Sequence, residues 1–498
     1  MRKRRIAAKV LLLSMLAGII AGCGSAEGGS LDIEREGDYV GNAMLSGGAD
    51  GSSGLELPVE SSGKGFTGEG ACDDMMAADG AMDSIKSSDK VSVESEAMPG
   101  EYSGGGEGCE YFPGKAVEPQ AGLLTAGEWR DNENWGFFAN LVRTGRFGFR
   151  TFGIVPYERV VVQALSGGQP AGQVKVELNT VSGSAVATAV TDHKGRAYLY
   201  YNVYGETQQP DHVVLIRPDG SRVQAELPQA AGQEPMGNEV PGSAEADGNV
   251  REALLPSGMQ DTKNQGGQGQ TRPKEILNSV ELTVEVGEMT PPVKSLDVMF
   301  VFDTTGSMGD ELLYLQKEFE DIAKRVADQS TRFSVNFYRD QGDEYVVRSN
   351  PFSDDIEKVE ALINAEYATG GGDYEEAVDL ALLDAVTGHE WREGAVKLAF
   401  LILDAPPHDT GETAANLRTA MEEATKQGIR IIPIASSGVD EKTEGFLRGI
   451  AMLTGGTYTF LTDDSGIGGS HLEPTVGAYT VEALNDMIVR LIKEYYGE

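Results

Sequence analysis

From Leu296 to the C-terminus, short apolar segments alternate with longer amphipathic segments. The apolar segments have the length of strands and lie at 296–302, 332–338, 345–347, 396–403, 429–434 and 457–461. The amphipathic segments have helical periodicity and lie at 310–329, 355–364, 374–386, 413–427, 441–453 and 481–496. Strands that are apolar along their whole length are buried on both faces, and alternation with helices is typical of a parallel sheet covered on both sides. The sequence therefore predicts a doubly wound α/β domain with a mostly parallel sheet.

The first apolar segment of this region ends in a carboxylate, Asp303, and two hydroxyls follow at Thr305 and Ser307. Open α/β sheets bind their ligands at the carboxyl ends of the strands, where this D-x-T-x-S pattern lies. One carboxylate and two neutral oxygens on a tight loop suit a hard divalent cation. The alternative is that these three residues only cap the helix expected to begin at Asp310.

Two further segments place oxygen-bearing side chains at the same edge of the predicted sheet. The stretch "ATGGGDYEEA" contains Thr369 and Asp373, and "LILDAPPHD" contains Asp404 directly after an apolar strand. Because such loops converge in a doubly wound sheet, we expect one metal site at this edge. Its candidate ligands are Asp303, Thr305, Ser307, Asp373, Asp404 and Thr369. We expect Mg²⁺ as the cation, with Mn²⁺ and Ca²⁺ as alternatives.

The region from about 294 to 498 resembles the von Willebrand factor A domain. The resemblance rests on "VFDTTGSM", "YRDQGDEYVVR", "GGGDYEEAVDLAL" and "LILDAPPH", which follow one another in the expected order. It implies a metal-ion-dependent adhesion site in which Thr305 and Ser307 bind the ion directly. Asp303 and Asp404 would then hold it through water molecules. An Asp or Glu carboxylate of a protein or peptide partner would fill the open coordination position.

This sequence departs from the family pattern at two positions of the metal site. Thr305 stands where Ser is commoner, which keeps the oxygen and adds a methyl group. Asp373 stands where many members have a metal-binding Thr, and Thr369 is the nearby hydroxyl alternative. The extra negative charge of Asp373 would change how strongly the bound ion attracts a further anion.

The first 22 residues read as a targeting segment. Basic residues at 2–5 and Lys9 precede an apolar core at 10–20 that is too short to span a bilayer. The sequence Ile20-Ala21-Gly22-Cys23 resembles the lipobox of bacterial lipoproteins, and implies cleavage before Cys23 and a lipid anchor on it. An ordinary signal peptide with a chance Cys is the alternative.

Three regions separate this leader from the α/β domain. Residues 23–117 are acidic and rich in Gly and Ser, which favours a disordered tether; its Cys72 and Cys109 could form one disulfide or stay as two thiols. Residues 118–228 combine an aromatic segment with short alternating strands, which favours a small antiparallel β-sandwich, and the stretch "VATAVTDHKGRAYLYYNV" resembles Ig-like modules of bacterial surface proteins. Residues 229–275 read as a flexible linker. We assign 276–498 to the α/β domain with a lead-in strand at 276–286, although that strand could instead complete the sandwich.

The net charge and the absence of certain motifs argue against several classes of function. A formal net charge of −37 argues against a nucleic-acid partner, which requires a basic surface. The sequence has no H-E-x-x-H, no G-x-S-x-G and no phosphate-binding G-x-x-x-x-G-K-[ST] motif, so we expect no enzymatic activity. The leading hypothesis is an envelope protein, held to the membrane by lipid, that captures a protein or peptide ligand through its cation.

Three alternatives remain open. One is an envelope scaffold whose metal site is structural or vestigial. Another is a metal-dependent envelope hydrolase that uses His408, four residues after Asp404, as its base. A third is a subunit of a metal-chelatase or ATPase assembly, against which the export signal argues.

Overall fold

The computed structural model describes residues 119–145, 150, 152–228, 277–290, 294–327 and 330–498, with the backbone of 250–251. All of them fall within one compact unit, Gly108–Glu498. The predicted leader, Cys23, the tether with Cys72 and Cys109, and nearly all of the linker lie outside the described residues and stay predictions. No helix in the described part of the chain has the length and apolar character needed to cross a membrane.

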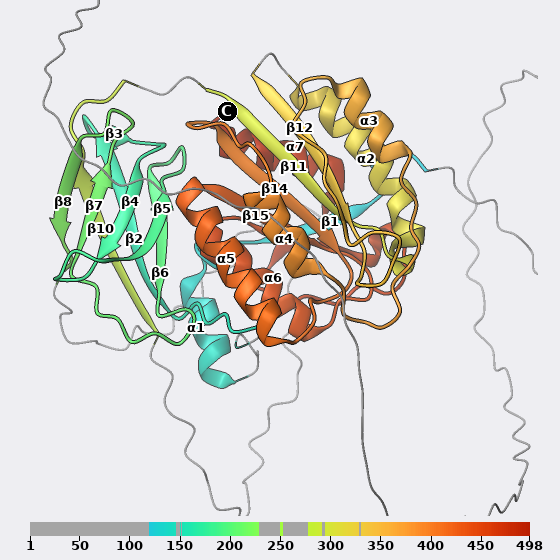
Figure 1. The fold of residues 1–498 in the computed structure, drawn as a ribbon, viewed down its shortest axis with the longest axis horizontal. Coiled ribbons are helices and arrows are strands. Elements are labelled where there is room, and N and C mark those ends of the chain that lie inside the picture. The colour runs from blue at the N-terminus through green and yellow to red at the C-terminus, as the bar shows by residue number, and fades with distance from the viewer. Residues whose placement is uncertain are drawn as a thin grey trace, which may run out of the picture. The chain divides into compact units, whose positions relative to one another are not determined.

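An eight-stranded sheet forms the centre of the C-terminal region (Figure 1). Its order is β13-β12-β11-β14-β15-β16-β1-β18. β11, β12, β14, β15 and β16 are mutually parallel, whereas β13, β1 and β18 pair antiparallel at the two sides. The strands are β1 (Thr125–Trp129), β11 (Leu296–Asp303), β12 (Thr331–Tyr338), β13 (Val347–Arg348), β14 (Val396–Leu403), β15 (Ile429–Ala435), β16 (Tyr458–Leu461) and β18 (Glu482–Ala483).

Helices cover both faces of this sheet (Figure 1). They are α1 (Trp135–Thr144), α2 (Gly309–Val326), α3 (Ile356–Asn364), α4 (Val378–Thr387), α5 (Gly411–Gln427), α6 (Glu441–Thr454) and α7 (Leu484–Tyr496), with 3-10 turns η1 (Gly306–Met308) and η2 (Asp463–Ser465). Successive residues of a strand point to opposite faces. Met299 and Val301 of β11 therefore pack in the core with α4, α5 and α6, while Phe300 and Phe302 pack in the core with α2, α3 and α7. The predicted doubly wound, mostly parallel sheet is confirmed.

The region before this domain is rich in β-strands, as predicted, and forms two four-stranded sheets around one core. One sheet has the order β10-β2-β3, with β6 also paired to β2, and the other has the order β5-β4-β7-β8. The strands are β2 (Glu158–Ser166), β3 (Gln169–Pro170), β4 (Lys175–Asn179), β5 (Ala185–Val190), β6 (Arg196–Tyr201), β7 (His212–Ile216), β8 (Arg222–Glu226) and β10 (Asn278–Glu285). Outside both sheets, β9 (Val250–Arg251) pairs with β17 (Tyr479–Thr480).

Strand β10 belongs to the sandwich and not to the α/β domain with which we grouped residues 276–286. It pairs in parallel with β2 along eight residues, from Asn278 opposite Glu158 to Glu285 opposite Leu165. Its alternating pattern predicts a strand with one buried face, but such a pattern does not identify the neighbouring strand. The other option stated for this segment, completion of the sandwich, matches the observed pairing.

The aromatic segment contacts the sandwich, since Arg159 lies 4.0 Å from the centre of the Trp135 ring and the Tyr200 hydroxyl donates to Asn132 Oδ1 at 2.6 Å, but its strand joins the other domain. Its strand β1 pairs with β16 and β18, so it extends the central sheet and not the sandwich. Asp131 forms a buried ion pair with Arg448 of α6, with Oδ1 2.6 Å from Nη2. Arg130 Nη2 lies 2.6 Å from Glu494 Oε2 of α7. The segment is therefore an integral part of the α/β domain, although it lies more than 150 residues away in the sequence.

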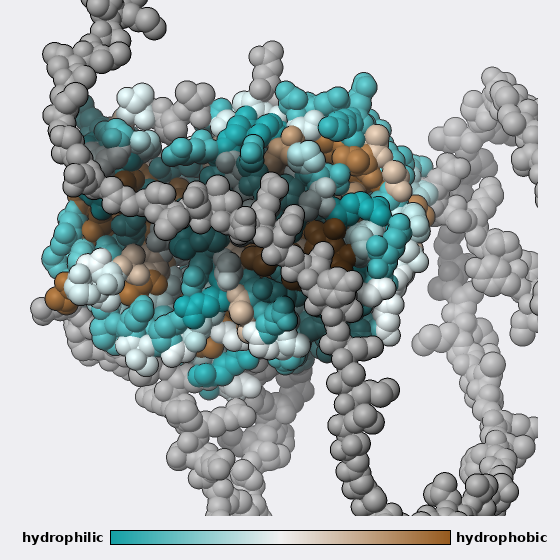
Figure 2. Space-filling view, in the orientation of Figure 1, coloured by the Kyte–Doolittle hydropathy of each residue, from teal (hydrophilic) through white to brown (hydrophobic). Residues whose placement is uncertain are grey.

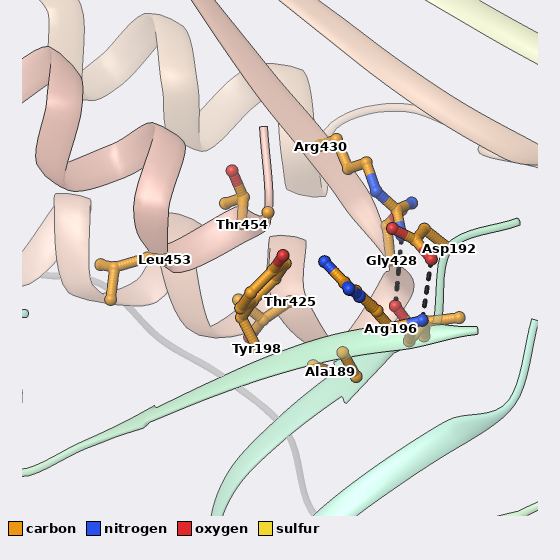
Figure 3. Close-up of a pocket in the computed structure, with 12 residues that line it drawn as sticks. Ala189, Asp192, Arg196, Tyr198, Thr425, Gly428, Arg430, Leu453 and Thr454 are labelled. Atoms are coloured by element: carbon orange, nitrogen blue, oxygen red, sulfur yellow. Dashed lines mark hydrogen bonds between the residues drawn. The ribbon is translucent and has the colours of Figure 1, made fainter. Parts of the chain in front are cut away.

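The sandwich packs against the α/β domain through β5 and β6, which contact α5 and α6. Gly428, at the end of α5, lies so close to Val190 that an added Cβ would be 2.8 Å from its side chain. Arg430 Nη2 donates a hydrogen bond to the Val190 carbonyl at 3.3 Å. Figure 3 shows this junction, where a cavity of about 20 Å³, lined in part by Tyr198 and Thr425, has room for a single water molecule.

Candidate metal centre

The parallel strands bring several loops to one edge of the sheet. β11 ends at Asp303 and β14 at Leu403, in neighbouring positions, because Phe302 is paired with Ile402. Asp404 follows β14 directly and therefore lies beside the end of β11. The loop 369–376 docks on the same place through its backbone, since Thr369 N donates to Thr304 O at 3.0 Å and Gly306 N donates to Gly370 O at 3.2 Å.

Asp303 is fully buried at the centre of this edge. Its Oδ1 accepts hydrogen bonds from the backbone N–H of Thr305 at 2.9 Å and from the Thr305 hydroxyl at 2.7 Å. Its Oδ2 accepts a hydrogen bond from the Tyr338 hydroxyl at 3.0 Å. The Thr305 and Ser307 hydroxyl oxygens lie 3.3 Å apart. The three candidate ligands of the first loop thus lie together, and Ser307 is the one exposed to solvent.

Asp404 adds a second buried carboxylate. It is 5 % exposed, and its Oδ1 has no hydrogen-bond partner. Burial and the negative charge of Asp303 raise the pKa of the Asp404 carboxyl to about 7, and a hydrogen bond from Ser307 opposes this shift. Burial likewise raises the pKa of Asp303 to about 6, against the hydrogen bonds from Thr305 and Tyr338. Two carboxylates are therefore held close together in a place where a proton or a cation is needed to neutralise them.

In the second loop, the two side chains predicted as ligands lie outside the buried part of the site. The side chains of Thr369 and Asp373 are exposed, and the loop is attached to the first loop through backbone atoms. The negative charge of Asp373 helps to raise the pKa of the His408 imidazole. As candidate ligands both residues stay predictions.

Glu376, which the sequence reading missed, is the buried carboxylate of this loop. It is 3 % exposed and its Oε2 has no hydrogen-bond partner. A Cβ added to Gly371 would lie 2.8 Å from Glu376 Oε1 and 3.4 Å from the Thr305 Cβ, so these three residues are neighbours. Burial, followed by the charges of Asp303, Asp340 and Asp404, raises the pKa of Glu376 to about 9. Only its position just before the apolar run Ala377-Val378 distinguishes Glu376 from Glu375 in the sequence.

The loop after β12 adds a further pair of acids. Asp343 Oδ2 accepts hydrogen bonds from Gly371 N at 2.9 Å and Asp340 N at 3.0 Å. Asp340 Oδ1 lies 2.7 Å from His408 Nε2. Burial disfavours protonation of His408, but the hydrogen bond and charge of Asp340 outweigh it and raise the pKa of the imidazole.

Another buried acid, Glu311, connects this edge with the loop after β16. Glu311 Oε1 accepts a hydrogen bond from Ser437 N at 3.1 Å and lies 3.2 Å from His471 Nε2. His471 Nδ1 lies 2.8 Å from Asp463 Oδ1. The charge of Glu311 also raises the pKa of Asp404, so this network adds to the negative potential of the site.

The donor atoms fit a hard divalent cation. Within the described ranges, no cluster of three or more His, Cys, Asp or Glu side chains is arranged to hold a metal ion. The ligands predicted from the sequence would not form such a cluster, because two of the central ones, Thr305 and Ser307, are hydroxyls. Asp404 Oδ1 and Glu376 Oε2 are buried oxygens without partners, and carboxylate and hydroxyl oxygens are ligands that Mg²⁺ accepts.

Comparison with known proteins agrees with this geometry. The von Willebrand factor type A domain family matches residues 297–468. No curated protein matches the chain. Among similar solved structures, the conserved hypothetical protein BatB from Bacteroides thetaiotaomicron has 13 % identity and a TM-score of 0.31, with 41 % of this chain and 100 % of that chain covered.

A second solved structure is an aerotolerance-related membrane protein from Bacteroides fragilis NCTC 9343 that carries multiple mutations to serines. It has 14 % identity and a TM-score of 0.28, with 40 % of this chain and 100 % of that chain covered. Nothing about the function of this chain follows from similarity at this level. The family match, the parallel sheet and the first-loop geometry agree, and residues 297–468 of this chain form a von Willebrand factor type A (VWA) domain.

Proposed function

We propose that this chain is an extracytoplasmic, lipid-anchored binding protein whose VWA domain captures a protein or peptide ligand through a divalent cation. Mg²⁺ is the expected ion, and Mn²⁺ or Ca²⁺ are alternatives. In this proposal Cys23 carries the lipid, residues 23–117 act as a tether, and the sandwich supports the VWA domain. The proposal includes no enzymatic activity.

One observation carries the proposal: Asp303 and Asp404 are buried together beside the solvent-exposed Ser307. A cation bound by the Ser307 and Thr305 hydroxyls would neutralise both carboxylates and still face solvent on one side. Neutral hydroxyl ligands withdraw little of the ion's charge, so the ion continues to attract an anion. A carboxylate of a partner protein meets that requirement, and octahedral Mg²⁺ readily takes one as a ligand.

The geometry of His408 supports a binding role over a hydrolytic one. A base that activates water must be unprotonated at the working pH. His408 Nε2 is instead paired with Asp340 at 2.7 Å, and that charge favours the protonated imidazolium form.

A scaffold with a purely structural metal site is the second candidate. The site could equally be vestigial, and the observation that favours this candidate is that Asp303 already accepts three hydrogen bonds within the protein, from Thr305 N, the Thr305 hydroxyl and the Tyr338 hydroxyl. Under this alternative, partner capture would be unaffected by EDTA. Under the leading proposal, EDTA abolishes partner capture and Mg²⁺ restores it.

Calorimetric titration of the purified chain with Mg²⁺, Mn²⁺ and Ca²⁺ tests the metal half of the proposal. We expect saturable binding with one ion per chain, which Asp303→Ala and Ser307→Ala abolish. Asp354→Ala, at an exposed position before α3, is the matched control and should bind as the wild type does. Equal binding by Asp303→Ala and the wild type would remove this site from the proposal.

A separate experiment tests the lipid anchor on Cys23 and the membrane location. We expect the full-length chain to label with a radioactive fatty acid and to sediment with membranes, and Cys23→Ser to do neither. Unchanged membrane association of Cys23→Ser would contradict the lipid anchor and leave the metal site untouched.

A further inference from the structure

The loops that surround the candidate metal centre are strongly acidic. We call them together the carboxyl edge; they are residues 303–310, 339–346, 369–377, 404–410, 436–440 and 462–478. Five of them follow parallel strands, and the sixth is attached to the first by the two backbone hydrogen bonds described above. These segments contain fourteen Asp and Glu residues, but only one Lys or Arg, which is Arg339.

That single arginine is buried, and the one exposed acid of the edge that it pairs with is Glu344, 3.4 Å from its Nη1. Just outside these segments, Lys442 lies 3.2 Å from Asp409. Arg339 is 1 % exposed, and its Nη2 donates a hydrogen bond to the buried Glu366 at 3.0 Å. The two histidines of the carboxyl edge are each already paired with an acid, His408 with Asp340 and His471 with Glu311. A partner that approaches the site therefore meets acids such as Asp373, which is exposed.

The opposite edge of the same sheet contains several basic residues. Arg332, Lys397 and Arg430 lie at the amino ends of β12, β14 and β15. Arg332 and Arg392 there bind the buried Asp297, at 2.8 and 2.7 Å. The negative charge is thus concentrated at the carboxyl edge and is not merely the average acidity of the chain.

A bound divalent ion would leave most of this charge in place. Its two positive charges would balance at most two of the fourteen acids, those of Asp303 and Asp404. The exposed acids around Ser307 would still repel a partner carboxylate, and like charges near an interface disfavour binding. A carboxylate can reach the ion easily only if the partner carries compensating positive charge beside it.

We propose that the carboxyl edge selects partners in which an Asp or Glu is flanked by Lys or Arg residues. This inference rests on the proposed function, and it names the class of partner for that site. An exposed aromatic side chain of the edge, Tyr374, suits the same partner, because it is 40 % exposed. Cationic side chains bind favourably over aromatic faces.

Four synthetic peptides, immobilised on a biosensor surface, test the inference with the full-length, Mg²⁺-loaded protein. One has a central Asp flanked by lysines, one has the same Asp flanked by serines, and one has it flanked by glutamates. The fourth has Asn in place of Asp between the lysines. We expect the lysine-flanked Asp peptide to bind at least about tenfold more tightly than the serine-flanked one at low salt, and this ratio to shrink as salt screens the charges.

A charge-neutralising variant connects the preference to the carboxyl edge. Glu344→Gln, Glu375→Gln and Asp409→Asn together remove three acids that are not candidate ligands. The matched control, Glu226→Gln with Glu281→Gln and Glu288→Gln, removes three exposed acids from the sandwich region. We expect the first triple variant to lower the preference for lysine flanks several-fold, and the control triple to keep it.

The outcomes distinguish a failure of this partner preference from a failure of the proposed function. Equal binding of the lysine-flanked and serine-flanked Asp peptides overturns this inference and leaves carboxylate capture intact. Equal binding of the Asp and Asn peptides between lysines also overturns it, because the protein would then be a simple polycation binder. If none of the Asp peptides binds in a manner that EDTA reverses, the proposed function itself fails.

Discussion

The negative charge of Asp303 raises the pKa of Asp404, whose carboxyl group follows the neighbouring parallel strand and has one oxygen without a hydrogen-bond partner. Two acids placed in this way oppose each other's ionisation in the absence of a cation. The sheet brings them together because β11 and β14 run in parallel and in register. A divalent ion would relieve the repulsion, so the same geometry couples cation binding to the stability of the fold.

The first prediction concerns pH. A carboxyl group whose pKa is higher in the folded state binds its proton more tightly there, so stability falls as pH rises from the unfolded pKa to the folded one. For Asp303 and Asp404 this window runs from about 4 to about 6 and 7. In EDTA, the melting temperature should fall between pH 5 and pH 7.5, and with saturating Mg²⁺ the fall should be smaller. Calorimetric scans with and without Mg²⁺ measure both, and parallel pH profiles would contradict the coupling.

The second prediction concerns Glu376, whose pKa of about 9 implies a proton on the folded carboxyl group at neutral pH. Taking up that proton costs free energy on folding, so Glu376→Gln should stabilise the cation-free protein, increasingly as pH rises from about 4.5 towards 9. Urea denaturation in EDTA at pH 5, 7 and 8.5 measures the gain. Glu375→Gln is the control from the same loop. A destabilised Glu376→Gln protein at pH 8.5 would show that this environment favours the charged form.

The third prediction concerns Gly371, which has a φ of +73° and lies against Glu376 and Thr305. Gly371→Ala adds a Cβ only 2.8 Å from Glu376 Oε1, so either the Glu376 carboxyl group or the loop must shift beside the candidate metal ligands. We expect Mg²⁺ affinity to fall about tenfold or more, on top of a backbone cost of about 1 kcal/mol. Gly394→Ala shares the positive φ (+74°) but has no atom within 4 Å of the new Cβ, and it should keep the affinity. Equal titration curves for the two variants would argue against Gly371 as a neighbour of the bound ion.

The fourth prediction concerns the N-terminal segment. Asp131 is 3 % exposed and pairs with Arg448, which has no exposed surface. Removal of Asp131 takes away the closer of the two acids that compensate the buried Arg448, and Glu444 Oε1 stays 3.3 Å from its Nη1, so Asp131→Ala should lower the free energy of unfolding by about 3 kcal/mol. Glu423→Ala, in a surface ion pair with Lys426, should cost less than about 1 kcal/mol. Urea denaturation compares the two, and a similar small effect for both would show that the segment adds little stability.

The sequence predicted the α/β domain well, because local patterns decide its strands. β11 and β14 are apolar along their whole length, and this pattern requires burial on both faces. The first loop was predictable for the same reason, since the carboxyl end of a parallel strand fixes where Asp303, Thr305 and Ser307 lie. The structure brings these three and Asp404 together, and their role as metal ligands stays a prediction.

Pairing between distant segments was not predictable from local patterns. β1 and β10 were identified as extended or aromatic segments, but their partners β16 and β2 depend on which sheet edge is open in the folded chain. Glu376 was missed for a related reason. Its burial arises because its backbone N–H donates to Pro406 O, which binds the second loop to the third, and no sequence period reports such a contact.

The most direct test of the account is a crystal structure of the protein grown with Mn²⁺, with anomalous difference density recorded near the manganese edge. We predict one strong peak bonded to the Thr305 and Ser307 hydroxyl oxygens, with Asp303 and Asp404 beside it directly or through water. A fully ordered carboxyl edge without such a peak, at a manganese concentration that saturates binding in solution, would contradict the central claim.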